Sequence, residues 1–509
     1  MMKRFLLLAF CACLGTTGLY AQVVKRVGRT TLPMNNRAGD DSDFYDKGSD
    51  DVFSFCWFSY DYPSTSGDGQ PTTLSAIACM PDGNGEGTVI NNVIAGCHIT
   101  ITSNKECPTE YNTSGSSFSD LYFTMLMAGG SILYQQDDNA YNNLVILPDY
   151  EGYGITKDRA HPYLCGETTG RQVADAVRYG IELYQSDAML QDIRRPLKEN
   201  WHTICTGYSQ GGAVAMATQR YIEEQGLSGQ LHLAGSFCGD GPYSPTATVL
   251  YYLEQDREGN ELVMPVVLPL ILKGMCEYDE ALEGCQVSDF LVDRFLETGV
   301  LEWIAEKEWN TDDITDEFKR LYNEGKDGDV TYFHPVLTSK GQAMLKNILK
   351  PEVYDYLNGL LDAYPDYVAG DIPQPEGDTP SEKLLRAMMH NDLTLGWTPE
   401  HPVCLYHSTG DDVVPYQNCL MAERRFGDMV KFFPSPMNGG HVDTGMEFFL
   451  NPQRLEGIRQ LAAMADDGVV SVQAAKAHPD RWYDVFGRPV VKPLSKGVYI
   501  REGKKILVK

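Results

Sequence analysis

The segment "TICTGYSQGGAVAMATQRYIEEQ", residues 203–225, places a serine between glycines where an apolar run meets an alanine-rich run. Gly207, Ser209 and Gly211 have the spacing G-x-S-x-G, in which a strand turns sharply into a helix and presents a serine nucleophile. The Ser209 hydroxyl then stands at a helix N-terminus, where backbone N–H groups favour developing negative charge. By itself the pattern is weak. The strand-like run before it and the helical run after it supply the context that the motif requires.

A serine hydroxyl is a poor nucleophile until a base takes its proton, so a histidine and an orienting carboxylate are required. In this topology they follow the serine in the order acid, then histidine, each on a loop after a later strand. The run "CLYHSTGDDVVPYQN" supplies Asp411, and "FFPSPMNGGHVDTG" supplies His441 after two glycines that let a loop reach the serine. The sequence therefore predicts a catalytic triad of Ser209, Asp411 and His441.

Several other residues compete for these roles. Asp412 adjoins Asp411 and is the alternative acid, whereas we expect Asp443 to be a carboxylate on a surface loop. The remaining histidines near strand ends are expected to have hydrogen-bonded structural roles. They are His98, His161, His202 and His407.

An oxyanion hole needs two N–H donors. One is expected from the backbone of Gln210, the residue after the nucleophile, and the other from the loop "CHITITSN", through the amide of Ile99 or Thr100. The chain contains no C-x-x-C pair and no H-E-x-x-H motif, so the sequence gives little support for a zinc site. The predicted chemistry requires neither a metal nor an organic cofactor.

Short apolar runs alternate with helical patterns in the first half of the chain. Residues 53–80 predict a hairpin, with aromatic and β-branched residues on either side of a Gly-Asp-Gly turn. Helical patterns at 117–130 and 170–185 separate the later apolar runs, which is typical of a parallel sheet covered by helices on both faces. The runs expected to hold strands are 89–96, 143–154, 202–212 and 231–245.

The alternation breaks between about Tyr243 and Glu400, where the sequence reads mostly as helix, and strands return from residue 401. This pattern predicts an inserted helical cap domain, with a separate helical domain as the alternative. The apolar patch 266–272 inside it either lines an acyl pocket or packs in the core. The expected divisions are a signal peptide at 1–21, a core at 22–242 and 401–465, a cap at 243–400 and a β-rich tail at 466–509.

Residues of roughly 50–465 resemble the α/β-hydrolase superfamily of serine esterases, lipases and peptidases. Within it, "LPDYEGYG", "HPYLCGETTGRQVADAVRYG" and "GYSQGG" are similar to the secreted bacterial and fungal secretory lipase group. The resemblance implies a Ser-Asp-His triad, a helical cap inserted before the acid, and a structural role for the loop 149–154. The tail resembles C-terminal segments of exported Bacteroidetes-type proteins.

These features favour a hydrolase that cleaves carboxylic esters through an acyl-enzyme on Ser209. A serine peptidase of the aminopeptidase type has the same triad and is the first alternative. A surface binding protein with a catalytically silent hydrolase fold is the second. The substrate is expected to be a small-molecule or lipid ester.

The N-terminus and the composition constrain location and partners. "MMKRFLLLAFCACLGTTGLYAQ" reads as a secretory signal with cleavage after Ala21, which predicts a secreted, periplasmic or outer-surface protein. A lipoprotein signal through Cys11 or Cys13 is the weaker interpretation. No second apolar run approaches the length of a membrane span, and a formal charge of −28 disfavours nucleic acid as a partner.

The cysteines give a further expectation. The chain has 13, and removal of the signal would leave an odd number, so at least one thiol is unpaired. Cys97 with Cys107, and Cys276 with Cys285, are near enough along the chain to pair. Cys205 and Cys404 lie in apolar runs and are expected to be buried thiols.

Overall fold

A computed structural model describes residues 22–33, 52–82, 89–110, 142–433, 435, 438–450 and 452–466, together with four short strands between residues 482 and 508. The predicted signal peptide at 1–21 and the predicted helix at 117–130 lie outside the described residues.

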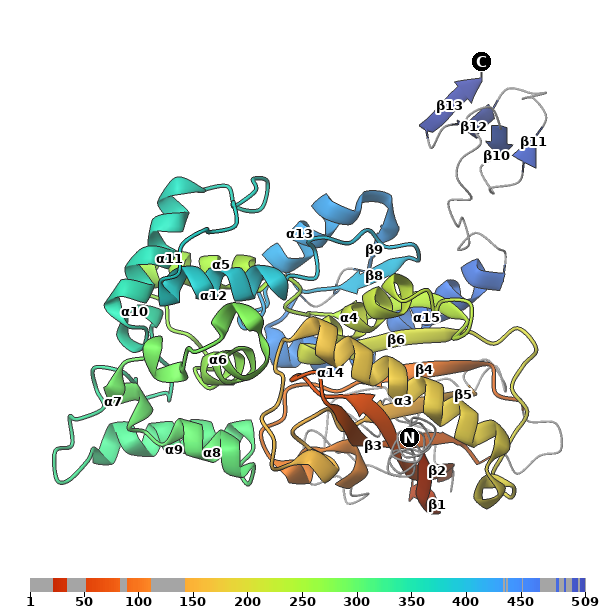
Figure 1. The fold of residues 1–509 in the computed structure, drawn as a ribbon, viewed down its shortest axis with the longest axis horizontal. Helices are drawn as coiled ribbons and strands as arrows, with labels where there is room; N and C mark the ends of the chain where they lie inside the picture. Colours follow the sequence, from red (N-terminus) through yellow and green to blue (C-terminus); the bar gives the residue numbers. More distant parts are fainter. Residues whose placement is uncertain are drawn as a thin grey trace, which may run out of the picture.

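A nine-stranded sheet forms the centre of the molecule, in the order β1-β2-β3-β5-β4-β6-β7-β8-β9 (Figure 1). The pairs from β1 to β5 in this order are antiparallel, and all pairs from β5 to β9 are parallel. The sheet is therefore mostly parallel, as the sequence predicted. The strands are β1 (Val23–Pro33), β2 (Val52–Thr65), β3 (Pro71–Pro81), β4 (Asn92–Cys97), β5 (Asn143–Pro148), β6 (Thr203–Tyr208), β7 (Leu233–Gly239), β8 (Val403–Tyr406) and β9 (Val430–Phe432).

Helices cover both faces of this sheet, which explains why its central strands are nearly continuous apolar runs. Along β4, Val93 and Ala95 belong to the hydrophobic cluster on one face and Ile94 to the cluster on the other. The first face is covered by α3 (Gly166–Ser186), α4 (Gln210–Glu224) and α13 (Gln417–Phe426), and the second by α14 (His441–Leu450) and α15 (Pro452–Asp466).

Two elements differ from the sequence-based expectation. The sequence did not predict β1, an edge strand that pairs antiparallel with β2 and carries the charged residues Lys25, Arg26 and Arg29. Charged side chains are common on edge strands, but they hide the apolar alternation that identifies a strand. His441 was expected on a loop, whereas it is the first residue of α14, so the prediction that Asp443 lies on a loop was wrong.

Residues 243–400, called the insertion below, connect β7 to β8 and contain only helices and turns, apart from isolated bridges. Figure 1 shows these helices gathered on one side of the sheet. They are α5 (Pro245–Glu258), α6 (Val267–Tyr278), α7 (Asp293–Leu296), α8 (Val300–Glu306), α9 (Thr311–Glu324), α10 (Leu345–Ile348), α11 (Pro351–Ala363) and α12 (Pro380–His390).

The insertion shares its hydrophobic core with the sheet. One cluster runs continuously from the strands beneath α3 and α4 into the insertion, where it includes Val266, Leu270 and Leu272 of the apolar patch. The buried Lys307 adds a polar link, because its ammonium group donates to the main-chain oxygens of Lys157 and Arg159. The insertion is thus packed on the core by both apolar and polar contacts, and the patch contributes to that packing.

Each cysteine that the structure describes is a free thiol, so neither Cys97 and Cys107 nor Cys276 and Cys285 are paired. Cys205 in β6 and Cys404 in β8 are buried, as predicted. None of the helices in the described ranges has the length and apolar character needed to cross a membrane.

The tail forms a separate four-stranded antiparallel sheet in the order β11-β10-β12-β13. Its strands are β10 (Trp482–Asp484), β11 (Pro489–Val490), β12 (Gly497–Arg501) and β13 (Lys504–Val508). The β-rich character expected for this region is therefore present.

The packing of α3 on α4 can be tested with two helical glycines. A Cβ atom at Gly170 in α3 would lie 2.4 Å from the main-chain oxygen of Ala217, whereas one at Gly359 in α11 would meet nothing within 4 Å. We expect Gly170→Ala to lower the free energy of unfolding by about 1–3 kcal/mol through overpacking. Gly359→Ala should raise it by up to about 1 kcal/mol, because alanine is the better helix former. Urea unfolding measures both changes. If the two variants change the free energy of unfolding in the same direction, the close approach of α3 to α4 at Gly170 is contradicted.

Candidate active site

Ser209 lies at a sharp turn between a strand and a helix. β6 ends at Tyr208 and α4 begins at Gln210, and Ser209 between them has φ 56° and ψ −125°. This left-handed conformation is unusual for a residue with a side chain and is characteristic of functional sites. A Cβ at Gly207 would lie 2.5 Å from the main-chain oxygen of Cys97, and one at Gly211 only 2.2 Å from it. Close backbone approach therefore explains why both motif positions are glycine.

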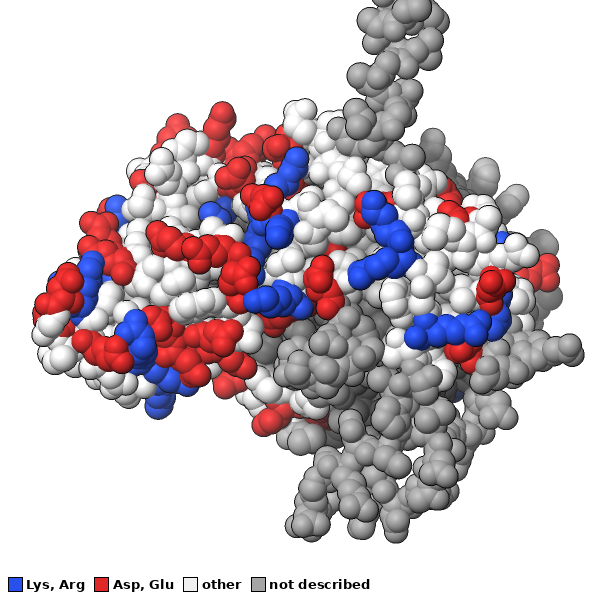
Figure 2. Space-filling model, turned by 90° about the horizontal axis from the view of Figure 1, so that it is seen from below, with Lys and Arg blue, Asp and Glu red and all other residues white. Residues whose placement is uncertain are grey.

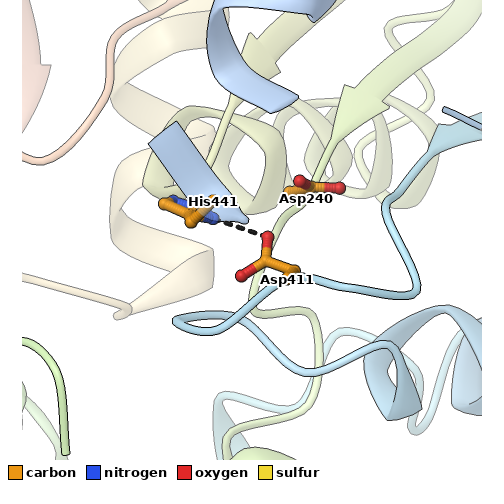
Figure 3. Close-up of side chains that lie close together, drawn as sticks. All are labelled: Asp240, Asp411 and His441. Carbon is orange, nitrogen blue, oxygen red and sulfur yellow. Dashed lines mark hydrogen bonds and ion pairs between the residues drawn. The ribbon is translucent and has the colours of Figure 1, made fainter. Parts of the chain in front are cut away.

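The histidine predicted as the base contacts both of its predicted partners. His441 Nε2 lies 2.9 Å from Ser209 Oγ, and His441 Nδ1 lies 2.6 Å from Asp411 Oδ2. A carboxylate only accepts hydrogen bonds, so Nδ1 carries the ring proton and donates it to Asp411. Nε2 of the neutral ring is then free to accept the proton of the serine hydroxyl. The contact between Asp411 and His441 is drawn in Figure 3.

Asp411 is held as a carboxylate by its surroundings. Its Oδ1 accepts the backbone N–H groups of Val413, at 2.8 Å, and Val414, at 2.7 Å, while Oδ2 faces the imidazole. Burial raises the pKa of Asp411, but the neighbouring His441 more than offsets this effect, and the pKa falls to about 2. The side chain is therefore charged at neutral pH, as an orienting acid must be.

Asp412, the alternative acid, has a different role in the structure. Its Oδ1 accepts the main-chain N–H of His441 at 2.9 Å. This N–H belongs to the first turn of α14, where backbone donors lack partners within the helix. Asp412 therefore fixes the start of the helix that carries His441, while Asp411 contacts the ring.

The sequence did not single out Asp240, which lies directly after β7 and is fully buried beside Asp411 and His441 (Figure 3). Its Oδ2 is 2.6 Å from Tyr208 Oη, and its Oδ1 accepts the N–H of Ser408 at 3.0 Å. The run "FCGDGP" contained a signal for it, namely a carboxyl group immediately after a buried parallel strand. The carboxyl ends of parallel strands meet at one edge of a sheet, where sites are commonly built.

Asp240, Asp411 and His441 have ligand atoms within 4.8 Å of one another, so we considered them as a metal site in the described part of the chain. Each of these carboxylate oxygens and ring nitrogens already has a hydrogen-bond partner among the residues around it. Hydrogen bonding therefore accounts for the cluster without an ion.

The first predicted oxyanion donor, Gln210, opens α4. Its side-chain amide donates to Nε2 of His161 at 2.7 Å, and His161 Nδ1 in turn donates to the main-chain oxygen of Glu151 at 2.8 Å. His161 is thus neutral in this arrangement, and burial lowers its pKa to about 3. These contacts fix the residue next to Ser209 and confirm the hydrogen-bonded structural role expected for His161, although the sequence did not indicate Gln210 as its partner.

The second predicted donor lies in the loop after β4. Thr100 Oγ1 is 2.7 Å from Tyr163 Oη, and the main-chain oxygen of Ile99 is 2.7 Å from His98 Nδ1. The loop also approaches the start of α4, since a Cβ at Gly211 would lie 2.8 Å from the main-chain oxygen of His98. The oxyanion role of Gln210, Ile99 and Thr100 stays a prediction.

No protein-family model matches the chain, and no curated protein matches it in sequence. Among solved structures, it is similar to the rice cell wall degrading esterase LipA from Xanthomonas oryzae, with 17% identity over 86% of this chain and 97% of that chain and a TM-score of 0.57. It is also similar to a putative hydrolase from Legionella pneumophila, with 15% identity over 86% and 98% of the two chains and a TM-score of 0.57. The chain has the α/β-hydrolase fold.

In an α/β-hydrolase, the nucleophile, acid and histidine follow separate strands in that chain order. Here Ser209 follows β6, Asp411 follows β8, and His441 follows β9. The rings of His98, His161 and His407 hydrogen-bond with main-chain oxygens instead. His98 stacks on Tyr150 with a ring separation of 3.8 Å, and His407 Nε2 donates to the main-chain oxygen of Val414 at 2.9 Å. His202, just before β6, is half-buried.

The neutral state of His161 predicts a pH dependence of stability. Its pKa in the folded protein, about 3, lies below the ordinary value of 6.5. Between these values the unfolded chain binds a proton that the native protein does not, so stability falls as the pH decreases through this window. At pH 5 the loss from this residue is on the order of 1–2 kcal/mol.

We therefore expect His161→Gln to be less stable than the wild type at pH 7 but to lose less stability between pH 7 and pH 5. Urea unfolding of both proteins at the two pH values measures this difference. Equal losses of stability in the two proteins would show that His161 has an ordinary pKa in the folded protein.

Proposed function

We propose that this α/β-hydrolase is a serine hydrolase that cleaves carboxylic esters through an acyl-enzyme on Ser209. The observation that carries the proposal is the pair of hydrogen bonds on one imidazole, 2.9 Å from Nε2 to Ser209 Oγ and 2.6 Å from Nδ1 to Asp411 Oδ2. The strained backbone of Ser209 at the start of α4 supports the same role for the serine.

In this reaction Ser209 Oγ attacks the acyl carbon while His441 Nε2 takes the hydroxyl proton. Asp411 stabilises the imidazolium that forms, and the oxyanion of the tetrahedral intermediate accepts N–H groups from Gln210 and from Ile99 or Thr100. The intermediate collapses as His441 returns the proton to the leaving alcohol. A water molecule, deprotonated by His441, then attacks the acyl carbon, and the carboxylic acid leaves as Ser209 regains its proton.

Two observations bear on the substrate class. The Xanthomonas protein that shares this fold is described as an esterase, which supports esters as the first choice. Figure 2 shows Asp and Glu side chains gathered over the insertion, and exposed carboxylates on α9 include Asp312, Asp313 and Asp316. An acidic surface of this kind would attract a substrate with a free amino group, which is why a peptidase of the aminopeptidase type is the second candidate.

The proposal is tested with residues 22–509 and the Ser209→Ala variant, assayed on p-nitrophenyl esters from C2 to C16 and on aminoacyl and prolyl p-nitroanilides. We expect ester hydrolysis by the wild type and a loss of kcat on the order of 10⁴–10⁶-fold in the variant. Anilide turnover above ester turnover would assign the peptidase activity instead. If neither panel reacts and a fluorophosphonate does not label Ser209, the chain is a binding protein with a silent hydrolase fold.

The two neighbouring carboxylates give a matched pair of variants. Asp411→Asn should lower kcat by about 10⁴-fold, because the amide no longer fixes the reactive tautomer of His441. In Asp412→Asn the side-chain oxygen still accepts the His441 N–H, so kcat should stay within about threefold of the wild type. Steady-state kinetics on the best ester of the panel compares them, and a larger loss in Asp412→Asn would identify Asp412 as the acid.

A further inference from the structure

Asp240 is a second buried carboxyl group behind the proposed triad, and the proposed mechanism does not use it. It has no exposed surface, and its backbone has φ 35°, an uncommon conformation for a residue with a side chain. The strand end that carries it also braces the nucleophile, because the Ser209 N–H donates to the main-chain oxygen of Gly239 at 2.9 Å. Asp240 thus lies in the rigid frame around Ser209 and His441.

The hydrogen bonds of Tyr208 determine where a proton must lie. Tyr208 Oη is 2.6 Å from Asp240 Oδ2 and also 2.6 Å from the main-chain oxygen of His441. A phenol has one proton, and a carbonyl oxygen only accepts. If Asp240 were ionised, one of the two contacts would hold two acceptor oxygens at 2.6 Å without a proton between them. A proton on Asp240 Oδ2 satisfies both, since Asp240 donates to Tyr208 and Tyr208 donates to His441.

The charges around Asp240 favour the same state. Burial and the nearby charge of Asp411 raise the pKa of Asp240 well above its ordinary value. His407 Nδ1 is 3.7 Å from Asp240 Oδ1, but burial lowers the pKa of His407 to about 4, so it brings no positive charge at neutral pH. The titratable groups that face Asp240 are Tyr208, Tyr243, His407, Asp411, Cys419 and His441.

We propose that Asp240 is a neutral carboxylic acid that positions His441 through Tyr208. Its proton lets Tyr208 donate to the main-chain oxygen of His441, which fixes the residue whose ring must reach both Ser209 and Asp411. Its neutrality also leaves the charge that contacts the imidazole on Asp411. A second charge there would stabilise the imidazolium in the resting enzyme and reduce the fraction of His441 able to act as a base. The benefit to catalysis rests on the proposed function, whereas the protonation state does not.

The protonation state is tested first, without reference to activity. Infrared spectra of the wild type and of Asp240→Asn at pH 7 should differ by the carbonyl stretch of one protonated carboxylic acid, present only in the wild type. The absence of that band would overturn the proposal even if the protein is an active esterase. Its presence would support the neutral state even if neither ester nor anilide is a substrate.

The positioning role is tested by two variants of the same residue. In Asp240→Asn the amide nitrogen can donate to Tyr208 and the amide oxygen can accept from Ser408, so kcat should stay within about fivefold of the wild type. Asp240→Leu fills the site without a donor, and we expect kcat to fall by roughly 10–100-fold with little change in KM, because His441 shifts from its reactive position. Equal losses in both variants would overturn the role. If the leucine variant does not fold, a large loss in Asp240→Asn alone would do so.

Discussion

The hydrogen bond between His441 and Ser209 joins residues 232 positions apart, and the site depends on the sheet to bring them together. A side-chain contact of 2.9 Å is far too weak to close so long a loop, because its net contribution is only about 1 kcal/mol. The backbone ladder from β6 through β9 provides the closure, and the loops after these strands meet at one edge. The imidazole then needs only small adjustments to contact both partners.

The dependence of the site on the sheet also explains how the long insertion between β7 and β8 is accommodated. Its two ends are tied to each other, since the Leu393 N–H donates to the main-chain oxygen of Tyr243 at 2.9 Å and Ser244 hydrogen-bonds with Asp392. The Ser244 N–H also donates to Asn418 in α13, at 2.8 Å. The chain therefore leaves and re-enters the sheet at one place, and the helices between these points do not displace Asp411 from His441.

Much of the site was predictable because its signals are local. The elbow around Ser209 is recognisable from two glycines forced by close backbone contacts, and Asp411 and His441 follow later apolar runs in the required order. The position of His441 at the start of α14 was not predicted, because two glycines precede it and the apolar part of the helix lies several residues further along. Cysteines near in sequence likewise did not indicate disulfides, since proximity along the chain does not place two sulfur atoms at bonding distance.

The roles of Tyr208 and Asp240 could not be predicted from the sequence, because they depend on which oxygen atoms of three separate segments carry a proton. The difference in charge between the buried carboxyl groups of Asp411 and Asp240 likewise depends on contacts from separate segments. Asp411 receives two backbone N–H groups and the imidazole, and each of these donors stabilises a negative charge. Asp240 receives one backbone N–H and faces a phenol whose proton is needed elsewhere. His441, together with the two backbone donors after β8, therefore favours the charge on Asp411, whereas burial and that charge favour a neutral Asp240. This arrangement gives the imidazole an anion on the side opposite the serine.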